Sequence, residues 1–369
     1  MPVSYCKRSK KREANYDLLR IISTIAVVSI HVISVYRSTI AKDFSLSTNT
    51  WENGDALIIA FLDALPRFSV PCFLMLTGAF LFDDEKIYKP GIFYKAKFQS
   101  LGIHFLIFII FSILFQICFI IFGEDHNGAS ELVINLAFGL PFYHMWYIYM
   151  YIGIIALAPF FAYAKELWEK IGYRFPVIYL IWSSLSAWLS GSSMIAWNIG
   201  YSFCWFSYVI MGYFIKKRTS KNNYRAFRDI SGGVLLECLA GIVVYWHIIH
   251  GMDEIDLSYQ YIDPFCPIIV IASVLIFKGF SEIKTDLRIA WKGVSLHCLI
   301  VYLIHPFIWE VLKKVIYHMR GADYIKPDEW ILFYFVYFFV VLFLSSVSSS
   351  IYLGIYQFLA NKVIFADKQ

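Results

Sequence analysis

Charged residues are scarce in this sequence. Asp, Glu, Lys and Arg make up 16% of its 369 residues, whereas an ordinary globular domain holds about 25%. Hydrophobic residues make up 59% and gather into runs of about 18 to 25 residues, long enough for a helix to cross a hydrocarbon layer about 30 Å thick. The composition therefore excludes a soluble domain and predicts an all-α, polytopic integral membrane protein.

The sequence also lacks the motifs of several classes of protein. Its seven cysteines are scattered and form no CxxC pair, so we expect no disulfide framework and no zinc site. The absence of GxSxG, of a Walker-type glycine loop and of GxGxxG excludes a nucleophile elbow, a nucleotide motor and a dinucleotide fold. No carboxylate cluster indicates a divalent metal. The net charge of +5 comes from basic residues between hydrophobic runs, which indicates membrane insertion bias and not nucleic-acid binding.

Hydrophobic runs bounded by turn and charge signals predict ten transmembrane helices within one membrane domain. Most of the 32 Lys and Arg residues lie in segments on the side of the N-terminus, so both termini are predicted to be cytoplasmic. The first run lacks a cleavage site and is expected to remain as the first span. We divide the chain into a basic segment at 1–16, a membrane domain at 17–354 and a tail at 355–369. The predicted spans are 17–36, 56–82, 99–122, 144–163, 175–190, 198–215, 229–250, 262–280, 293–312 and 330–354.

A few ionisable residues interrupt these runs. A charge inside a membrane is costly unless it faces a cavity or a partner, so each such residue is a candidate for function. For the three that lie nearest the predicted cytoplasmic ends, His104, Glu237 and His297, we favour a structural role because polar side chains there reach interface water. The full set is Arg20, His31, Asp63, Arg67, His104, Glu237, His297 and His305.

An arginine and a histidine share one face of the first span. Arg20 and His31 are eleven residues apart, which is three helical turns plus about 20° and a rise of about 16 Å. His31 then lies near the bilayer midplane, and Arg67 reaches a similar depth from the other side. Two interpretations stay open. Either these residues form a functional base and cation, or His31 bonds a neighbouring helix and Asp63 merely neutralises Arg67 at i,i+4.

Two further histidines lie beside structural signals. His144 opens the fourth span in an aromatic cluster with Trp146, which is typical of an aromatic belt at the interface and also suits stacking against a sugar. His305 precedes Pro306, which removes a backbone hydrogen bond and often marks a kink where helices line a cavity. Structural and functional roles are equally open for His305.

Four segments resemble the acyltransferase-3 family of integral membrane proteins. They are an arginine followed after ten residues by a histidine, a second-span arginine with Val-Pro-x-Phe and a glycine turn, a His-x-Trp segment, and a late Tyr-Leu-x-His pattern. They occur in order over most of the chain. In this sequence they are Tyr16–His31, Arg67–Leu81, His144–Tyr149 with Ala158–Phe160, and Tyr302–Pro306.

The resemblance implies a ten-helix enzyme that moves an acyl group, usually acetyl, from acetyl-CoA in the cytoplasm to a sugar hydroxyl. It implies a catalytic role for His31, as a base or as a transient acyl carrier, and donor-binding or site-shaping roles for Arg20 and Arg67. Where relatives often have an arginine pair at the start of the third span, Lys97 replaces one arginine and the second is absent. We expect Arg20, Lys95 and Lys97 to attract the anionic donor.

On this interpretation Arg67 is catalytic beside His31, because it can stabilise charge on the thioester oxygen. His144, Trp146 and His305 are expected to bind the acceptor, a cell-envelope glycan or its lipid-linked precursor, in the bacterial cytoplasmic (inner) membrane, with no metal ion. No extracytoplasmic esterase-like domain is expected, so the chain resembles the stand-alone acetyltransferases of O-antigen and enterobacterial common antigen.

Two other classes of function remain. A transporter or flippase for a lipid-linked saccharide would also place charges at the midplane, although the sequence shows no repeat symmetry. A non-catalytic sensor or scaffold would keep the fold without the chemistry. The acceptor hydroxyl, the acyl length, the choice between direct transfer and an acyl-histidine, a partner protein and the oligomeric state are open.

Overall fold

The protein is helical throughout the part that the computed structural model describes, which is residues 13–48, 50–122, 143–190, 199–250, 260–285, 293–320 and 328–366. These ranges contain no β-strand. Within the described ranges, seven helical segments are long and apolar enough to span a membrane, which confirms an all-α, multi-pass membrane protein. The predicted basic segment lies mostly outside the described residues. The seven segments are Ala14–Leu46, Asn53–Leu81, Pro90–Cys118, Trp146–Tyr163, Asn223–Ile249, Val294–Met319 and Trp330–Leu359.

The other three predicted spans are also helices, namely α9 (Arg174–Ser190), α10 (Ile199–Arg218) and α13 (Pro267–Glu282). They do not reach the length and hydropathy of the seven. Helices α9 and α13 have only 17 and 16 residues, where a span needs about 20, and α10 ends in three basic residues. The count of ten spans and the cytoplasmic termini therefore stay predictions.

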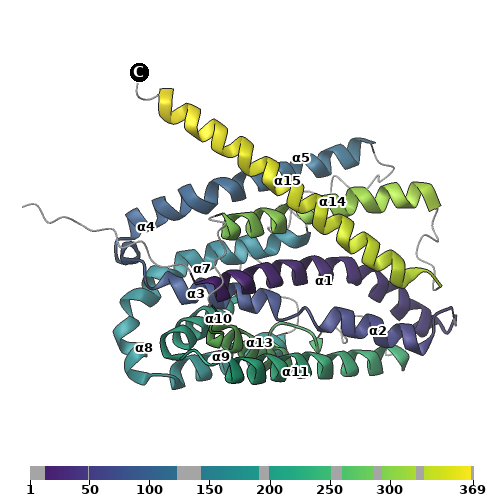
Figure 1. Cartoon of the computed structure of the whole chain (residues 1–369), viewed down its shortest axis with the longest axis horizontal. Coiled ribbons are helices and arrows are strands. Elements are labelled where there is room, and N and C mark those ends of the chain that lie inside the picture. Colours follow the sequence, from purple (N-terminus) through teal and green to yellow (C-terminus); the bar gives the residue numbers. More distant parts are fainter. Residues whose placement is uncertain are drawn as a thin grey trace, which may run out of the picture.

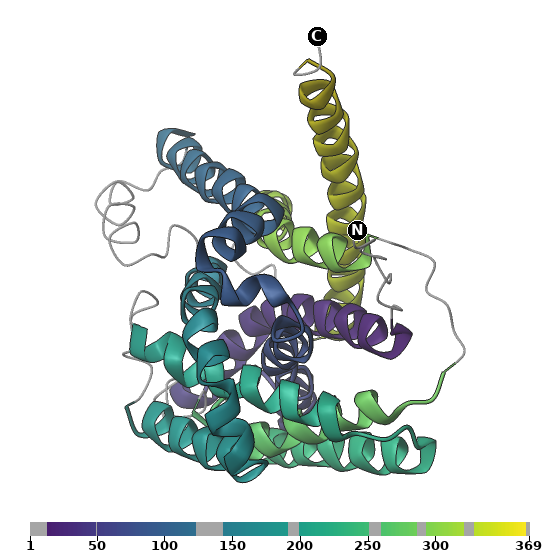
Figure 2. The same cartoon turned by 90° about the vertical axis from the view of Figure 1, so that its left-hand side faces the viewer.

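Helix α1 (Ala14–Leu46) runs through the middle of the molecule (Figure 1). On one side lie α5 (Ile103–Phe122), α14 (Val294–Arg320) and α15 (Trp330–Ala366), and on the other lie α11 (Asn223–Ile249) and α13 (Figure 2). Helix α1 contacts α14, α15, α11 and α13. Several polar side chains of α1, among them Asn15, Asp17 and Arg37, are buried.

The second predicted span is broken into α2 (Asn53–Ala64) and α3 (Ser69–Leu81) by a turn over 65–68. Pro66 accounts for the break, because proline has no N–H to donate to the carbonyl four residues earlier and its ring crowds that carbonyl. Arg67 lies in this turn. The prediction of a continuous helix over 56–82 missed the break, since a hydropathy pattern does not register a backbone turn.

Helices α3 and α10 pack backbone to backbone. A Cβ atom at Gly78 would lie 1.7 Å from the carbonyl oxygen of Val209, and one at Gly212 would lie 2.0 Å from that of Met75. Only glycine permits this approach, which is a common means of tight helix packing in membranes.

The third span consists of α4 (Pro90–Lys97), a π-helical turn η2 (Phe98–Gly102) and α5. It packs beside α7 (Trp146–Tyr163), and the Tyr94 hydroxyl donates a hydrogen bond to the carbonyl of Ala156 at 2.9 Å. These two elements form one wall of the cavity described below.

Two helices exceed their predicted ranges. Helix α1 continues past 36 to Leu46, so Arg37 and Lys42, which follow the predicted span 17–36, are helical. Helix α15 continues past 354 to Ala366, so most of the predicted tail is helical. In both cases the helix extends beyond the end of the hydrophobic run.

Candidate functional site

Three histidines from distant parts of the chain converge between α1, α14 and the short helix η3 (Tyr143–Met145). The ring centroids of His31 and His305 are 5.0 Å apart, and those of His144 and His305 are 6.2 Å apart. His144 and His305 are fully buried, whereas His31 is partly exposed. The structure thus places the predicted base beside two of the residues predicted to bind the acceptor.

Helix α14 supplies both His305 and the residue that anchors His144. The Tyr302 hydroxyl donates a hydrogen bond to the backbone carbonyl of His144 at 2.8 Å, which ties η3 to α14. Pro306 lies inside α14. Because proline lacks an N–H, the helix cannot supply its usual hydrogen bond to the carbonyl of Tyr302. The backbone hydrogen bond that Pro306 removes is therefore one beside the histidine cluster.

A buried ionic network lies in the second span and α1. Asp63 is completely buried and forms ion pairs with Arg67, four residues on, and with Arg37 of α1, whose Nε lies 3.1 Å from Asp63 Oδ2. The Asp63–Arg67 pair considered above therefore forms, but it is not a closed pair, because Asp63 also pairs with Arg37. Arg67 is also close enough to act electrostatically on His31.

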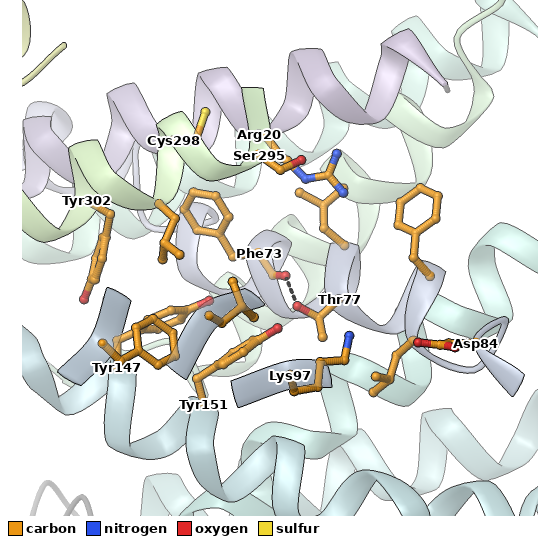
Figure 3. A pocket seen from close by; sticks show the side chains of 16 residues that line it. Arg20, Phe73, Thr77, Asp84, Lys97, Tyr147, Tyr151, Ser295, Cys298 and Tyr302 are labelled. Atoms are coloured by element: carbon orange, nitrogen blue, oxygen red, sulfur yellow. Dashed lines mark hydrogen bonds between the residues drawn. The ribbon is translucent and has the colours of Figure 1, made fainter. Parts of the chain in front are cut away.

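A cavity of about 310 Å³ leads from a charged rim toward the histidines. Figure 3 shows Arg20 and Lys97 on opposite walls of the cavity, with Asp84 at one end and Tyr147 and Tyr302 at the other. The rim thus holds two of the three predicted donor-binding cations, Arg20 and Lys97, and the inner end reaches the tyrosine that contacts His144 and His305. Its lining is completed by Phe73, Leu76, Thr77, Phe80, Leu81, Leu101, Phe105, Tyr151, Ser295, Cys298 and Leu299.

The two rim cations differ in their surroundings. Arg20 pairs with Asp17 at 2.8 Å and lies over the Phe80 ring, 5.4 Å from its centroid. Lys97 lies 5.4 Å from the centroid of the Phe93 ring. Lys97 forms no ion pair with a described residue, so its charge is the more available of the two to an anionic ligand.

Two predicted site residues lie outside this arrangement. Lys95 is exposed and does not line the cavity. Trp146 is half-buried and packs against Trp205, with ring centroids 5.7 Å apart. Neither contributes to the cavity or to the histidine cluster, although Trp146 is joined to His144 through one residue.

The histidines expected to be structural do make helix-to-helix contacts. His104 of α5 lies 2.7 Å from the Tyr352 hydroxyl, and His297 of α14 lies 3.0 Å from the Ser349 hydroxyl. Both contacts fasten a helix to α15. Glu237 is fully buried in α11, and the two histidines are buried as well, so the expectation that these three side chains reach interface water was wrong.

Several residues of the site were not singled out from the sequence. Arg37 stands directly after the first hydrophobic run, just outside the predicted span 17–36. Tyr147 and Tyr151 lie on one face of α7 with stacked rings 5.9 Å apart. Their four-residue spacing is the signal of a shared face. Because aromatic residues make up 19% of the chain, pairs with this spacing are common and this one does not stand out.

The arrangement suits the binding of a slender molecule with an anionic end. Cations at the rim can bind phosphate groups, and the interior is largely apolar and aromatic. The imidazole rings beyond Tyr302, which do not line the cavity themselves, can accept a proton. In the described ranges, no group of three or more His, Cys, Asp or Glu side chains is arranged to hold a metal ion.

Comparison with known proteins agrees with these features. The model of an acyltransferase domain, that of the acyltransferase-3 family, matches residues 13–350. This range includes every described helix except the end of α15. No curated protein and no solved structure matches the chain.

Proposed function

Because the chain belongs to the acyltransferase-3 family, we propose that it transfers an acetyl group from acetyl-CoA to a hydroxyl of a cell-envelope glycan or of its lipid-linked precursor. We place this reaction in the bacterial cytoplasmic membrane. The observation that carries the proposal is the cavity that joins the cationic rim at Arg20 and Lys97 to Tyr302 beside the histidine cluster.

The donor enters from the rim. CoA carries several phosphate groups on a flexible arm that ends in the thioester. Phosphate oxygens accept strong charge-assisted hydrogen bonds from Arg20 and Lys97, while the arm follows the apolar lining inward. The thioester then stands near Tyr302, within reach of the rings beyond it.

His31 provides the base. Acyl transfer from a thioester to an alcohol requires a group that takes the hydroxyl proton, and an imidazole is suited to this. His31 either activates the hydroxyl directly or carries the acyl group transiently. Arg67 lies close enough to influence charge at His31. Since Asp63 already pairs with it, Arg67 acts as part of the network with Arg37 and not as an isolated cation.

The acceptor approaches the cluster from the side of η3. His144 belongs to the cluster through its contacts with His305 and Tyr302. Stacking of a sugar on Trp146, which packs against Trp205 outside the cluster, stays a part of the proposal that the geometry of the site does not carry. The resemblance to the acyltransferase-3 family, which implies a sugar hydroxyl as acceptor, supports the glycan acceptor of the proposal.

The match to an acyltransferase domain over residues 13–350 does not favour a transporter or flippase. A sensor that retains the fold without the chemistry makes a different prediction, because loss of His31 would then leave every chemical product unchanged.

The test is transfer of radiolabelled acetyl from acetyl-CoA into lipid-linked and surface glycan fractions of membranes that contain the full chain. We expect label with the wild type, no label with His31→Ala, and wild-type label with His104→Ala. His104 is a suitable control because it is a buried histidine that lies outside the cavity. Equal label in wild type and His31→Ala, or none in either, overturns the proposal.

A further inference from the structure

His305 is held in one orientation by its own helix. Its Nδ1 atom lies 3.2 Å from the backbone carbonyl oxygen of Val301, one turn earlier in α14. A carbonyl oxygen only accepts hydrogen bonds, so Nδ1 must carry the proton. In the neutral ring, Nε2 then bears a lone pair and can accept a proton.

This Nε2 atom is buried without a hydrogen-bond partner among the described residues. His305 itself has no solvent exposure. Buried polar atoms are rarely left unpaired, because desolvation without a hydrogen bond costs free energy. A buried acceptor without a partner therefore needs an explanation, which we seek in the side chains that surround His305.

The ring nearest to His305 in the cluster is that of His31, with a centroid separation of 5.0 Å and an interplanar angle of 41°. Two imidazoles at this distance can bring one nitrogen of each within reach of a shared proton. The other titratable groups facing His305 are His144 from η3 and Tyr302 from its own helix, while Arg67 acts on His31 from the second span. The carboxylate of Asp63 is engaged by two arginines.

We propose that His305 is the proton-relay partner of His31, a role that rests on the proposed acyl transfer and extends it. When the acceptor hydroxyl attacks, its oxygen bonds to the thioester carbon, the carbon–sulfur bond breaks and the hydroxyl proton moves to His31. His31 passes its other ring proton to Nε2 of His305. The proton returns along the same path to the sulfur, so CoA leaves as the thiol and both rings return to neutral.

The relay explains why the second histidine stands where it does. Tyr302 lines the cavity and precedes His305 by about one helical turn, so the inner end of the cavity lies beside the histidine cluster. A positive charge shared by two rings is more easily formed than one confined to His31, which favours deprotonation of the hydroxyl. If His305 only fills space, its ability to take a proton has no effect on the reaction.

The test uses full-length protein in detergent and measures release of CoA thiol and acyl transfer with His305→Gln, His31→Gln and the double variant. Glutamine keeps a donor for the Val301 carbonyl but cannot take a proton. We expect His305→Gln to lower kcat about 100-fold, to leave the KM for acetyl-CoA unchanged and to alter the pH profile of kcat. The double variant should be no slower than His31→Gln, because two residues that act as one unit are not additive.

Several outcomes would overturn the inference. One is a wild-type kcat and pH profile in His305→Gln. Another is a double variant whose loss of kcat is the product of the losses in the two single variants.

His104→Gln serves as the matched buried control and should keep the wild-type pH profile. Should His305→Gln not fold, His305→Asn, which also cannot take a proton, replaces it, with an unchanged KM for acetyl-CoA as the sign of an intact donor site. A wild-type protein that releases no thiol overturns the proposed function itself, whereas an active wild type with an unaffected His305→Gln overturns the relay alone.

Discussion

Asp63 forms ion pairs with two arginines, and this determines what a substitution there removes. The side chains of Arg37 and Asp63 are 2% and 0% exposed, and that of Arg67 is 14% exposed. Burying charges is favourable only when they are paired with good geometry, and removing one partner leaves an uncompensated charge. Asp63 is therefore the residue on which the network depends, although the reaction is expected to use Arg67.

We expect Asp63→Ala to destabilise the protein by about 3–5 kcal/mol, the usual cost of breaking a buried ion pair. Arg67→Ala leaves Arg37 and Asp63 as a one-to-one pair and should lose acyl transfer with a smaller loss of stability. Thermal unfolding in detergent measures the difference. The control is Asp83→Ala, which breaks the solvent-exposed ion pair between Asp83 and Lys216. This substitution should lower the free energy of unfolding by no more than about 1 kcal/mol. Equal midpoints for Asp63→Ala and Asp83→Ala would contradict a network centred on Asp63.

The two lysines of α4 provide a matched pair for the donor site. Lys97 lines the cavity, whereas Lys95 on the same helix is exposed and does not. We expect Lys97→Ala to raise the KM for acetyl-CoA about tenfold, which corresponds to the loss of about 1.4 kcal/mol of binding. Lys95→Ala should change it much less, since a charge outside the cavity contributes only screened attraction. Initial rates at varied acetyl-CoA concentration decide this, and a larger effect from Lys95→Ala would place the donor outside the cavity.

At the scale of the elements, hydrophobic runs predicted where helices occur but not how they end or bend. A helix occupies most of each of the ten predicted ranges. The extension of α1 to Leu46 was missed because polar residues follow Tyr36, and hydropathy does not distinguish a buried polar turn from a loop. The break between α2 and α3 was missed although Pro66 was visible, because proline occurs both in kinked and in interrupted helices.

Close contact between α3 and α10 also depends on a feature that composition alone does not reveal. Gly212 faces the backbone of Met75, so any side chain there forces the helices apart. We expect Gly212→Leu to lower the thermal midpoint strongly, since overpacking typically costs about 1–3 kcal/mol and more where backbone obstructs relaxation. Gly54→Ala, with nothing within 4 Å of the added Cβ, should leave the midpoint unchanged or slightly higher. A Gly212→Leu protein as stable as Gly54→Ala would rule out the tight α3–α10 contact.

For the whole molecule, the sequence predicted the separate parts of the site better than their assembly. His31, His144 and His305 were each identified from local pattern, yet nothing in their spacing indicates that three helices bring them within 5.0 and 6.2 Å of one another. The cavity is likewise built from helices α1, α3, α4, α5, α7 and α14 together with η2. Such a site depends on tertiary packing, which periodicity along one helix does not encode. Arg37 was missed for the same reason, because its partner lies on another helix.

The orientation of the molecule links the cavity to its donor. Lys216 of α10 lies 4.0 Å from the centroid of Phe80, which lines the cavity, and Lys221 lies 3.8 Å from Glu13 at the start of α1. The rim, the basic end of α10 and the beginning of α1 therefore share one end of the bundle, and α15 also ends toward it (Figure 1). If the basic residues are cytoplasmic, as their number predicts, the cavity opens to the compartment that holds acetyl-CoA.

Reporter insertions test this orientation directly. A fluorescent protein that matures only in the cytoplasm should be bright when inserted after Lys221 or fused after Gln369, and alkaline phosphatase, active only outside, should be active when inserted at 321–327 between α14 and α15. Each insertion is checked for retained acyl transfer so that the native topology is the one observed. Phosphatase activity after Lys221 would place the cationic rim outside, where it could not meet a cytoplasmic thioester. In that case Lys97 and Arg20 would have to bind an anionic acceptor instead, and the direction of transfer through the cavity would be reversed.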